Sequence, residues 1–107
     1  MMDWNYTFHD YEWDVAKYRL PTAETDYVIL GLIGEIGELY GKWAKSIRDE
    51  TKMDALDVKK ELGDVLWFLT MLCRDLGTSL GEVANINEAK LAKRMAKGTI
   101  QGSGDER

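Results

Sequence analysis

Residues 29–47 have the sequence ILGLIGEIGELYGKWAKSI. Apolar residues recur in this stretch about every 3.6 positions, which is typical of one face of an α-helix. The members of this apolar stripe are Ile29, Leu32, Ile33, Ile36, Leu39, Tyr40, Trp43 and Ile47. We therefore expect a long helix that is capped by Thr22 or Thr25 and ends near Arg48.

Residues 4–18, rich in aromatic side chains, predict a shorter helix before this one. That helix should end before Pro21, because the residue that precedes a proline is disfavoured in the α conformation.

Two further helices are predicted after the long one. Asp54 is a suitable N-cap for a third helix, which Gly77 should end. Ser79 and Glu82 have the spacing of a capping box and predict a fourth helix that ends near residues 97–98. No segment alternates with a period of two for long enough to make a strand, so we predict an all-α fold.

The charge of the chain argues against two classes of partner. The chain has 107 residues, with 14 Lys and Arg against 19 Asp and Glu and a net charge of −5. An acidic chain of this length predicts one domain that binds neither a nucleic-acid polymer nor an anionic membrane. No apolar run approaches the roughly 20 residues that span a bilayer.

The soft metal ligands are few, because the chain has one His and one Cys. They cannot form a zinc site, so any bound metal should have oxygen ligands. Cys73 has no partner for an internal disulfide, and the N-terminus lacks the pattern of a signal peptide, so we expect a cytoplasmic protein.

Two pairs of acids have the spacing i, i+3: Glu35 with Glu38, and Glu61 with Asp64. If the second and third helices form an antiparallel hairpin, Glu35 lies level with Asp64 and Glu38 with Glu61, since the residue numbers of each pair add up to 99. Four carboxylates in one place repel one another unless a cation neutralises them. Mg²⁺ or Mn²⁺ suits such ligands.

A solvated helix face is the alternative interpretation of Glu35 and Glu38, and Lys42 could then pair with Glu38 at i, i+4. Two features favour a cleft instead. Glycines interrupt the same helix and indicate a close approach to its backbone; they are Gly31, Gly34, Gly37 and Gly41. On the third helix, the apolar residues 67, 68 and 71 follow the acids and indicate burial on that side.

The predicted fourth helix carries Asn87, Lys90 and Arg94 at the spacing i, i+3, i+7. The two cations are either surface residues with buried stems or ligands of phosphate oxygens.

The acidic pattern resembles that of a known family. Gly31-Leu-Ile-Gly-Glu-Ile-Gly-Glu38, followed by Glu61-Leu-Gly-Asp-Val-Leu-Trp67, resembles the ExxE…ExxD signature of MazG-like nucleoside triphosphate pyrophosphohydrolases. This all-α superfamily also includes dimeric dUTPases and phosphoribosyl-ATP pyrophosphohydrolases. The similarity extends from about Leu30 to the C-terminus and includes Lys90 and Arg94.

The resemblance implies that residues 1–107 form one MazG-like domain, a four-helix-bundle-like fold completed in a homodimer or tetramer. It implies Mg²⁺-dependent hydrolysis of an NTP or dNTP between the α- and β-phosphates, which releases the monophosphate and pyrophosphate in nucleotide-pool house-cleaning. The implied metal ligands are Glu35, Glu38, Glu61 and Asp64, with Mn²⁺ as a possible substitute for Mg²⁺. The implied substrate contacts are Asn87, Lys90 and Arg94, and Glu38 is our candidate for the general base.

Several aromatic residues are candidates for contact with the nucleobase of the substrate. Trp67, one turn beyond Asp64, could stack on a nucleobase, and so could Trp43 or the aromatic residues of segment 4–18; core packing is the alternative for each. We also hypothesise that Asp105 or Arg107 of the glycine-rich tail closes over the site.

Two other functions remain open at this point. The same metal chemistry would serve a dUTP or phosphoribosyl-ATP pyrophosphohydrolase. A non-enzymatic helical interaction module, whose acids are merely solvated, would release no pyrophosphate.

Overall fold

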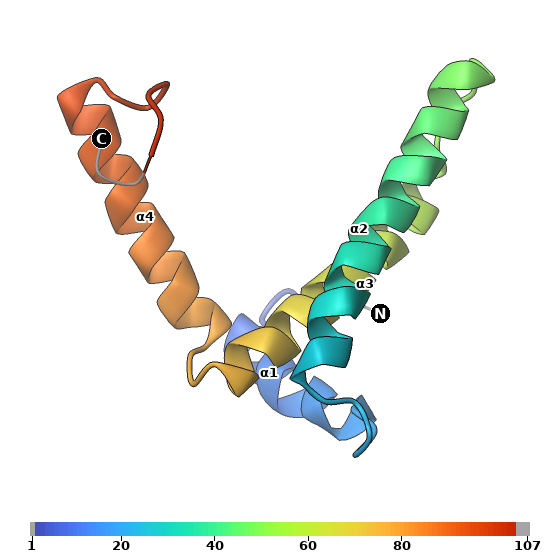
Figure 1. The fold of residues 1–107 in the computed structure, drawn as a ribbon, viewed down its shortest axis with the longest axis horizontal. Coiled ribbons are helices and arrows are strands. Elements are labelled where there is room, and N and C mark those ends of the chain that lie inside the picture. The colour runs from blue at the N-terminus through green and yellow to red at the C-terminus, as the bar shows by residue number, and fades with distance from the viewer. Residues whose placement is uncertain (1, 105–107) are drawn as a thin grey trace.

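The computed structural model describes residues 2–104, and all regular structure in this range is helical. Figure 1 shows the helices in chain order. Their bounds are α1 Phe8–Val15, the 3-10 turn η1 Ala16–Tyr18, α2 Thr25–Arg48, α3 Ala55–Asp75 and α4 Leu80–Lys97. The prediction of an all-α fold is confirmed.

The helix α2 packs against α3 as an antiparallel hairpin (Figure 1). Val28 and Met71 are fully buried. Gly31 allows the close approach of the two helices, because a Cβ there would lie 2.2 Å from the Phe68 ring. The other three glycines of α2 face open space in the single chain. The expected close approach to the glycine backbone is therefore observed at Gly31 alone among the four.

The apolar stripe of α2 lies mostly outside this hairpin. Ile33 is 62% exposed and Tyr40 72% exposed, while only Leu32 and Leu39 of the stripe are half-buried. The side of α2 that contacts α3 instead includes Gly31 and Glu35. The stripe predicted the helix correctly, but within one chain it is a surface and not a core.

Three helix termini follow the predicted capping pattern. The Asp57 amide donates to the Asp54 side chain at the start of α3, and the Glu82 amide donates to the Ser79 hydroxyl at the start of α4. Gly98 ends α4 in the left-handed conformation, with φ 70°. This conformation carries little strain only for a residue without a Cβ.

The predicted cap of α2 is wrong. Glu24 occupies the N-cap position and makes no side-chain cap hydrogen bond. Thr25 is the first helical residue, and its hydroxyl donates to Asp75 Oδ2 at 2.8 Å. A tertiary contact therefore uses one of the two side chains that the local pattern offered for capping.

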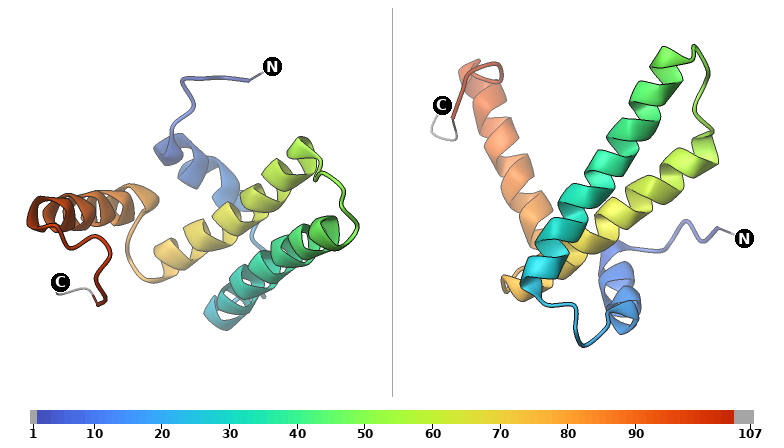
Figure 2. Two further views of the ribbon diagram at one scale, coloured as in Figure 1. Left: turned by 90° about the horizontal axis from the view of Figure 1, so that it is seen from above. Right: turned by 45° about the vertical axis from the view of Figure 1, so that its right-hand side comes forward.

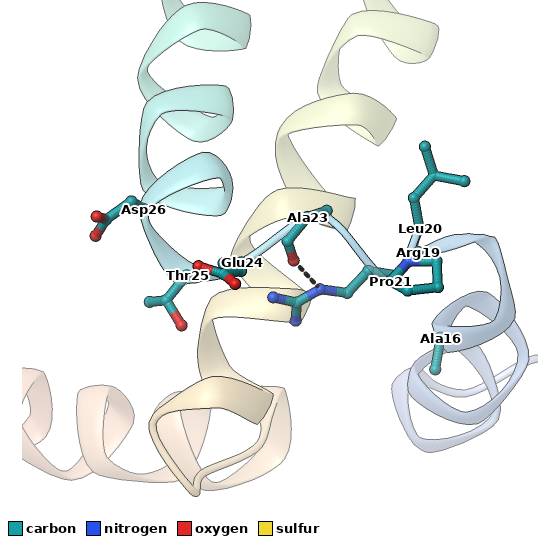
Figure 3. Close-up of a pocket in the computed structure, with 8 residues that line it drawn as sticks. All are labelled: Ala16, Arg19, Leu20, Pro21, Ala23, Glu24, Thr25 and Asp26. Carbon is teal, nitrogen blue, oxygen red and sulfur yellow. Dashed lines mark hydrogen bonds between the residues drawn. The ribbon is translucent and has the colours of Figure 1, made fainter.

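Arg19 links the segment before α2 to the end of α3. Its guanidinium donates to both Asp75 oxygens, at 2.7 and 3.0 Å. Its Nε donates to the Ala23 carbonyl at 2.8 Å, the contact that Figure 3 shows. The hydrogen bonds from Arg19 and Thr25 hold the pKa of the Asp75 carboxyl below its usual range.

The helix α1 is held by polar contacts to α3 and α4. The Trp67 indole Nε1 donates to the Val15 carbonyl at 3.1 Å, and the Leu80 amide donates to the Glu12 carboxylate. Glu12 thereby provides a negative charge at the N-terminus of α4, where the helix dipole favours one.

The helix α4 diverges from the α2–α3 hairpin, so that the described chain is V-shaped (Figures 1 and 2). The radius of gyration is 16.8 Å, whereas a compact domain of this length should have about 13 Å. Among residues 2–104, no helix combines the length and apolarity needed to cross a bilayer.

Replacing Asp75 with Asn should lower the free energy of unfolding by about 1–2 kcal/mol, because it removes a carboxylate that accepts three hydrogen bonds from side chains. The folded-state pKa of Asp75 is lowered, so its stabilisation is present above the usual carboxyl pKa of about 4 and is lost as the pH falls through the folded-state value. Urea unfolding of both proteins across this pH range measures the difference. Asp49→Asn, which removes an exposed pair with the adjacent Arg48, is the control and should have little effect. Equal stability of the Asp75 variant and the wild type at neutral pH would contradict this account of the contact.

Candidate metal centre

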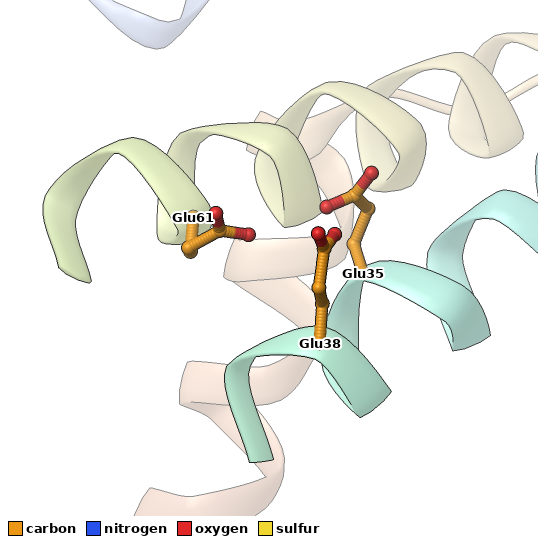
Figure 4. Close-up of side chains that lie close together, drawn as sticks. All are labelled: Glu35, Glu38 and Glu61. Carbon is orange, nitrogen blue, oxygen red and sulfur yellow. The ribbon is translucent and has the colours of Figure 1, made fainter. Parts of the chain in front are cut away.

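Three carboxylates converge between α2 and α3 (Figure 4). Glu35 and Glu38 extend from successive turns of α2, and Glu61 reaches toward them from α3. Each of the three offers an oxygen, and these oxygens all lie within 4.8 Å of one another. The register inferred from residue numbers therefore brings three of the four predicted acids together.

Two oxygens of this cluster are buried without a hydrogen-bond partner in the described structure, Glu35 Oε2 and Glu61 Oε2. An unsatisfied buried polar atom costs about 1–3 kcal/mol, and more when the group is charged. A divalent cation among these oxygens would remove that cost. Carboxylate oxygens alone form a donor set that suits hard cations.

Burial and the crowding of carboxylates both raise the pKa of Glu35. Burial is the main cause that raises the pKa of its carboxyl, and the negative charges of Asp64, Glu38 and Glu61 raise that pKa further. A cation in the cluster would oppose each of these effects.

The three clustered acids differ in exposure. Glu35 and Glu61 are half-buried between the helices, whereas Glu38 is exposed. A fully solvated acid face is therefore wrong for Glu35 and Glu61, and an approach from solvent remains at Glu38.

Asp64, the fourth predicted ligand, is exposed and lies outside the group of three. Its charge still acts on the cluster through Glu35. It also acts on Tyr11 of α1, whose pKa is raised mainly by burial and further by Asp64. Tyr11 therefore lies near the acidic side of the hairpin, and it is one of the aromatic residues of segment 4–18 that we considered for stacking on a nucleobase.

Lys42 is the cation beside the cluster, and it pairs across the hairpin. Its Nζ donates to Glu61 Oε1 at 2.8 Å and to the two Asp57 oxygens at 3.0 and 3.1 Å. These two carboxylates raise the pKa of Lys42 above its usual range. The alternative pair of Lys42 with Glu38 is replaced by these contacts. The sequence contained a signal for them, since the residue numbers of Lys42 and Asp57 also add up to 99.

The predicted phosphate contacts lie on α4, the arm that diverges from the α2–α3 hairpin in Figure 1. Asn87 is exposed and Lys90 half-buried. Arg94 is 6% exposed, and its guanidinium donates to the Gly104 carbonyl at 3.2 Å. Within one chain these residues are therefore not brought to the carboxylate cluster. Asp105 and Arg107, for which we predicted closure over the site, lie outside the described residues.

Trp67 lies at a small aromatic pocket beside the start of α2. The pocket has a volume of about 210 Å³ and is lined by Tyr18, Leu20, Thr22, Ala23, Tyr27 and Trp67. The indole is half-buried, and its ring meets Phe68 edge to face at 5.1 Å between centroids. Trp67 thus takes part in packing while one side lines a cavity.

Comparisons of the sequence with known proteins identify its family. The family model described as the MazG nucleotide pyrophosphohydrolase domain matches residues 24–99. This range contains both acidic pairs, Lys42 and all of α4. The chain is also 42% identical over 85 residues to the Gene 37 protein of Mycobacterium phage L5, a match that covers 76% of this chain and 75% of the phage protein. No solved structure matches significantly. With most of its length matched by the family model, the chain belongs to the MazG nucleotide pyrophosphohydrolase family.

Proposed function

We propose that this protein hydrolyses nucleoside or deoxynucleoside triphosphates to the monophosphate and pyrophosphate, with Mg²⁺ or Mn²⁺ held by Glu35, Glu38, Glu61 and Asp64. The observation that carries the proposal is the convergence of three carboxylates with two buried, unpartnered oxygens in a chain of this family. House-cleaning of the nucleotide pool, in the cytoplasm, is the role we propose.

The exposure of each acid indicates whether it would bind the cation or accept a proton. Glu35 and Glu61 are half-buried and would hold the cation, while the exposed Glu38 carboxylate can accept a proton from the attacking water. The bound cation would supply stabilisation of the charge that develops on the leaving pyrophosphate. Asp64 borders the cluster on α3 and would complete the ligand set.

The base would lie toward the aromatic pocket. Trp67 follows Asp64 by one helical turn, so it projects from the same side of α3. A nucleotide with its phosphates at the acids would extend along this side. Its base could then stack on the indole, while the Val15 carbonyl holds the ring in position.

A homodimer, or a tetramer built from it, would cover the apolar face of α2. This face is exposed in the single chain over several turns; its most exposed members are Ile33, Ile36, Tyr40, Trp43 and Ile47. Exposed apolar surface of this extent marks an interaction site. We propose that α4 of a second copy brings Asn87, Lys90 and Arg94 to the phosphates, since α4 of the same chain diverges from the α2–α3 hairpin that carries the acids (Figure 1).

One incubation tests the reaction. The protein is mixed with pooled NTPs and dNTPs, with dUTP and with phosphoribosyl-ATP, with and without Mg²⁺, and the released phosphate species are identified. We expect pyrophosphate and a monophosphate only with the metal. Orthophosphate and a diphosphate would contradict the proposal, because a different bond would have been broken. Release of no phosphate species would favour the helical interaction module.

Glu38→Gln and Glu61→Gln should each lower kcat by at least about a hundredfold, since one removes the proton acceptor and the other a cation ligand. Initial rates of pyrophosphate release measure the effect. Glu50→Gln, in the turn between α2 and α3, removes the same charge away from the cluster and should leave the rate unchanged. Full activity of the Glu38 and Glu61 variants would exclude these roles.

Trp67→Leu should raise KM for the preferred nucleotide about tenfold, because stacking of a base on an aromatic ring contributes about 1–3 kcal/mol. Trp67→Phe keeps a ring and should raise KM less. Both variants lose the hydrogen bond to Val15, so the comparison isolates stacking. Equal KM values in the two variants would argue that Trp67 only packs.

Ile36→Glu should convert the assembly to monomers, because it places a charge on the apolar face of α2. Sedimentation velocity measures the assembly. Leu56→Glu, at a similarly exposed apolar position at the start of α3, is the control and should leave it intact. An unchanged assembly in the Ile36 variant would place the interface elsewhere.

A further inference from the structure

The two carboxylate oxygens of Glu61 lie in different environments, because Lys42 contacts one of them. Its ammonium donates to Oε1 at 2.8 Å, while Oε2 is buried and has no hydrogen-bond partner in the described structure. The Glu61 side chain is only 12% exposed, so it has little freedom to turn. One oxygen is therefore occupied and the other is available.

Asp57 holds Lys42 in this position from the same helix that carries Glu61. Both Asp57 oxygens accept from the ammonium, at 3.0 and 3.1 Å, one turn before Glu61 on α3. The lysine thus bridges two carboxylates, and its contact with Glu61 does not depend on a bound substrate. This bridge is built into the α2–α3 hairpin.

The difference between the two Glu61 oxygens affects which metal ion can bind, because metal ions differ in how they use carboxylates. Ca²⁺ takes six to eight oxygens at about 2.3–2.6 Å and often binds both oxygens of one carboxylate. Mg²⁺ requires a near-octahedral set at about 2.0–2.1 Å and takes one oxygen from each carboxylate, with water for the rest. A carboxylate that has already given one oxygen to an ammonium can offer only the other.

We propose that Lys42 is a positioning residue that selects small octahedral cations over Ca²⁺, by keeping Glu61 Oε1 out of the coordination sphere. The inference rests on the metal centre of the proposed function and adds its selectivity. Lys42 acts through Glu61 and has no contact of its own with the cation.

A simple charge effect makes a different prediction. Loss of a positive charge beside the acids would strengthen the binding of every divalent cation to a similar degree. Loss of positioning would strengthen Ca²⁺ relative to Mn²⁺, because a freed Glu61 could bind with both oxygens. The ratio of the two affinities therefore separates the explanations, and the absolute affinities do not.

The experiment measures metal binding by the full chain without nucleotide. Free Mn²⁺ is followed by its electron paramagnetic resonance signal, and Ca²⁺ is added as a competitor. Lys42→Met keeps an unbranched side chain, one atom shorter, but removes the donor, and it should reduce the preference for Mn²⁺ over Ca²⁺ about tenfold or more. Lys42→Arg keeps a cationic donor and should retain most of the preference.

Two further variants make the result decisive. Lys45→Met removes the same charge from an exposed position one turn beyond Lys42 on α2, where it has no ion pair with the clustered acids in the described structure, and should leave the ratio unchanged. Asp57→Asn removes the anchor of Lys42 and should shift the ratio in the same direction as Lys42→Met, by less. Circular dichroism checks that each variant is folded.

Equal changes for Mn²⁺ and Ca²⁺ in Lys42→Met would overturn the inference and leave the metal centre intact. If the wild type bound neither cation, the metal centre would fail, and the selectivity proposed for it would fail with it. Pyrophosphate release by the wild type in Mg²⁺ is measured in parallel, so that failure of the proposed function is recognised separately.

Discussion

The antiparallel pairing of α2 with α3 forces acidic side chains of both helices into the same space, and the rest of the site depends on this constraint. Glu35 and Glu61 are half-buried there, each with an oxygen that lacks a partner. Like charges at this spacing are unfavourable unless cations or protons offset them. Within the described part of the chain, Lys42 is such a cation, and it pairs with Glu61 and Asp57. The remaining charge is what a divalent cation would neutralise.

A second constraint follows from the way α2 distributes its side chains. The face that carries the acids is turned toward α3, so the apolar stripe must point outward. With α4 diverging from the hairpin, the single chain buries few large side chains and is less compact than a domain of its length. Among residues 2–104, the buried oxygens Glu35 Oε2 and Glu61 Oε2 therefore have no hydrogen-bond partner, and the apolar face of α2 is exposed.

Much of this arrangement could be predicted from particular residues. Asp54, Ser79 and Gly98 mark helix ends by local rules that need no tertiary information, and the structure follows them. The acids were predicted because a hairpin register relates residues on two helices. Local rules offer Thr22 or Thr25 as the cap of α2, because they cannot foresee Asp75, which lies 50 residues beyond Thr25 and accepts from its hydroxyl. The pair of Lys42 with Glu38, which belonged to the alternative interpretation of a solvated face, also rested on a local rule, whereas two carboxylates across the hairpin make the contacts.

Periodicity also has a limit here. It identifies which side chains of α2 share a face, but it does not tell whether that face meets another helix of the same chain. Ile36 and Tyr40 are as regular in spacing as any core residue, yet both are exposed. Only the position of α3 decides this, and Gly31 is the residue that admits α3 on the acidic side.

A crystal structure of the protein grown with Mn²⁺ tests the central claim most directly, through the anomalous scattering of the metal. The account predicts a peak among the carboxylates of Glu35, Glu38 and Glu61, with Lys42 still on the other oxygen of Glu61. Absence of a peak at these carboxylates, with manganese bound elsewhere or not at all, would contradict it.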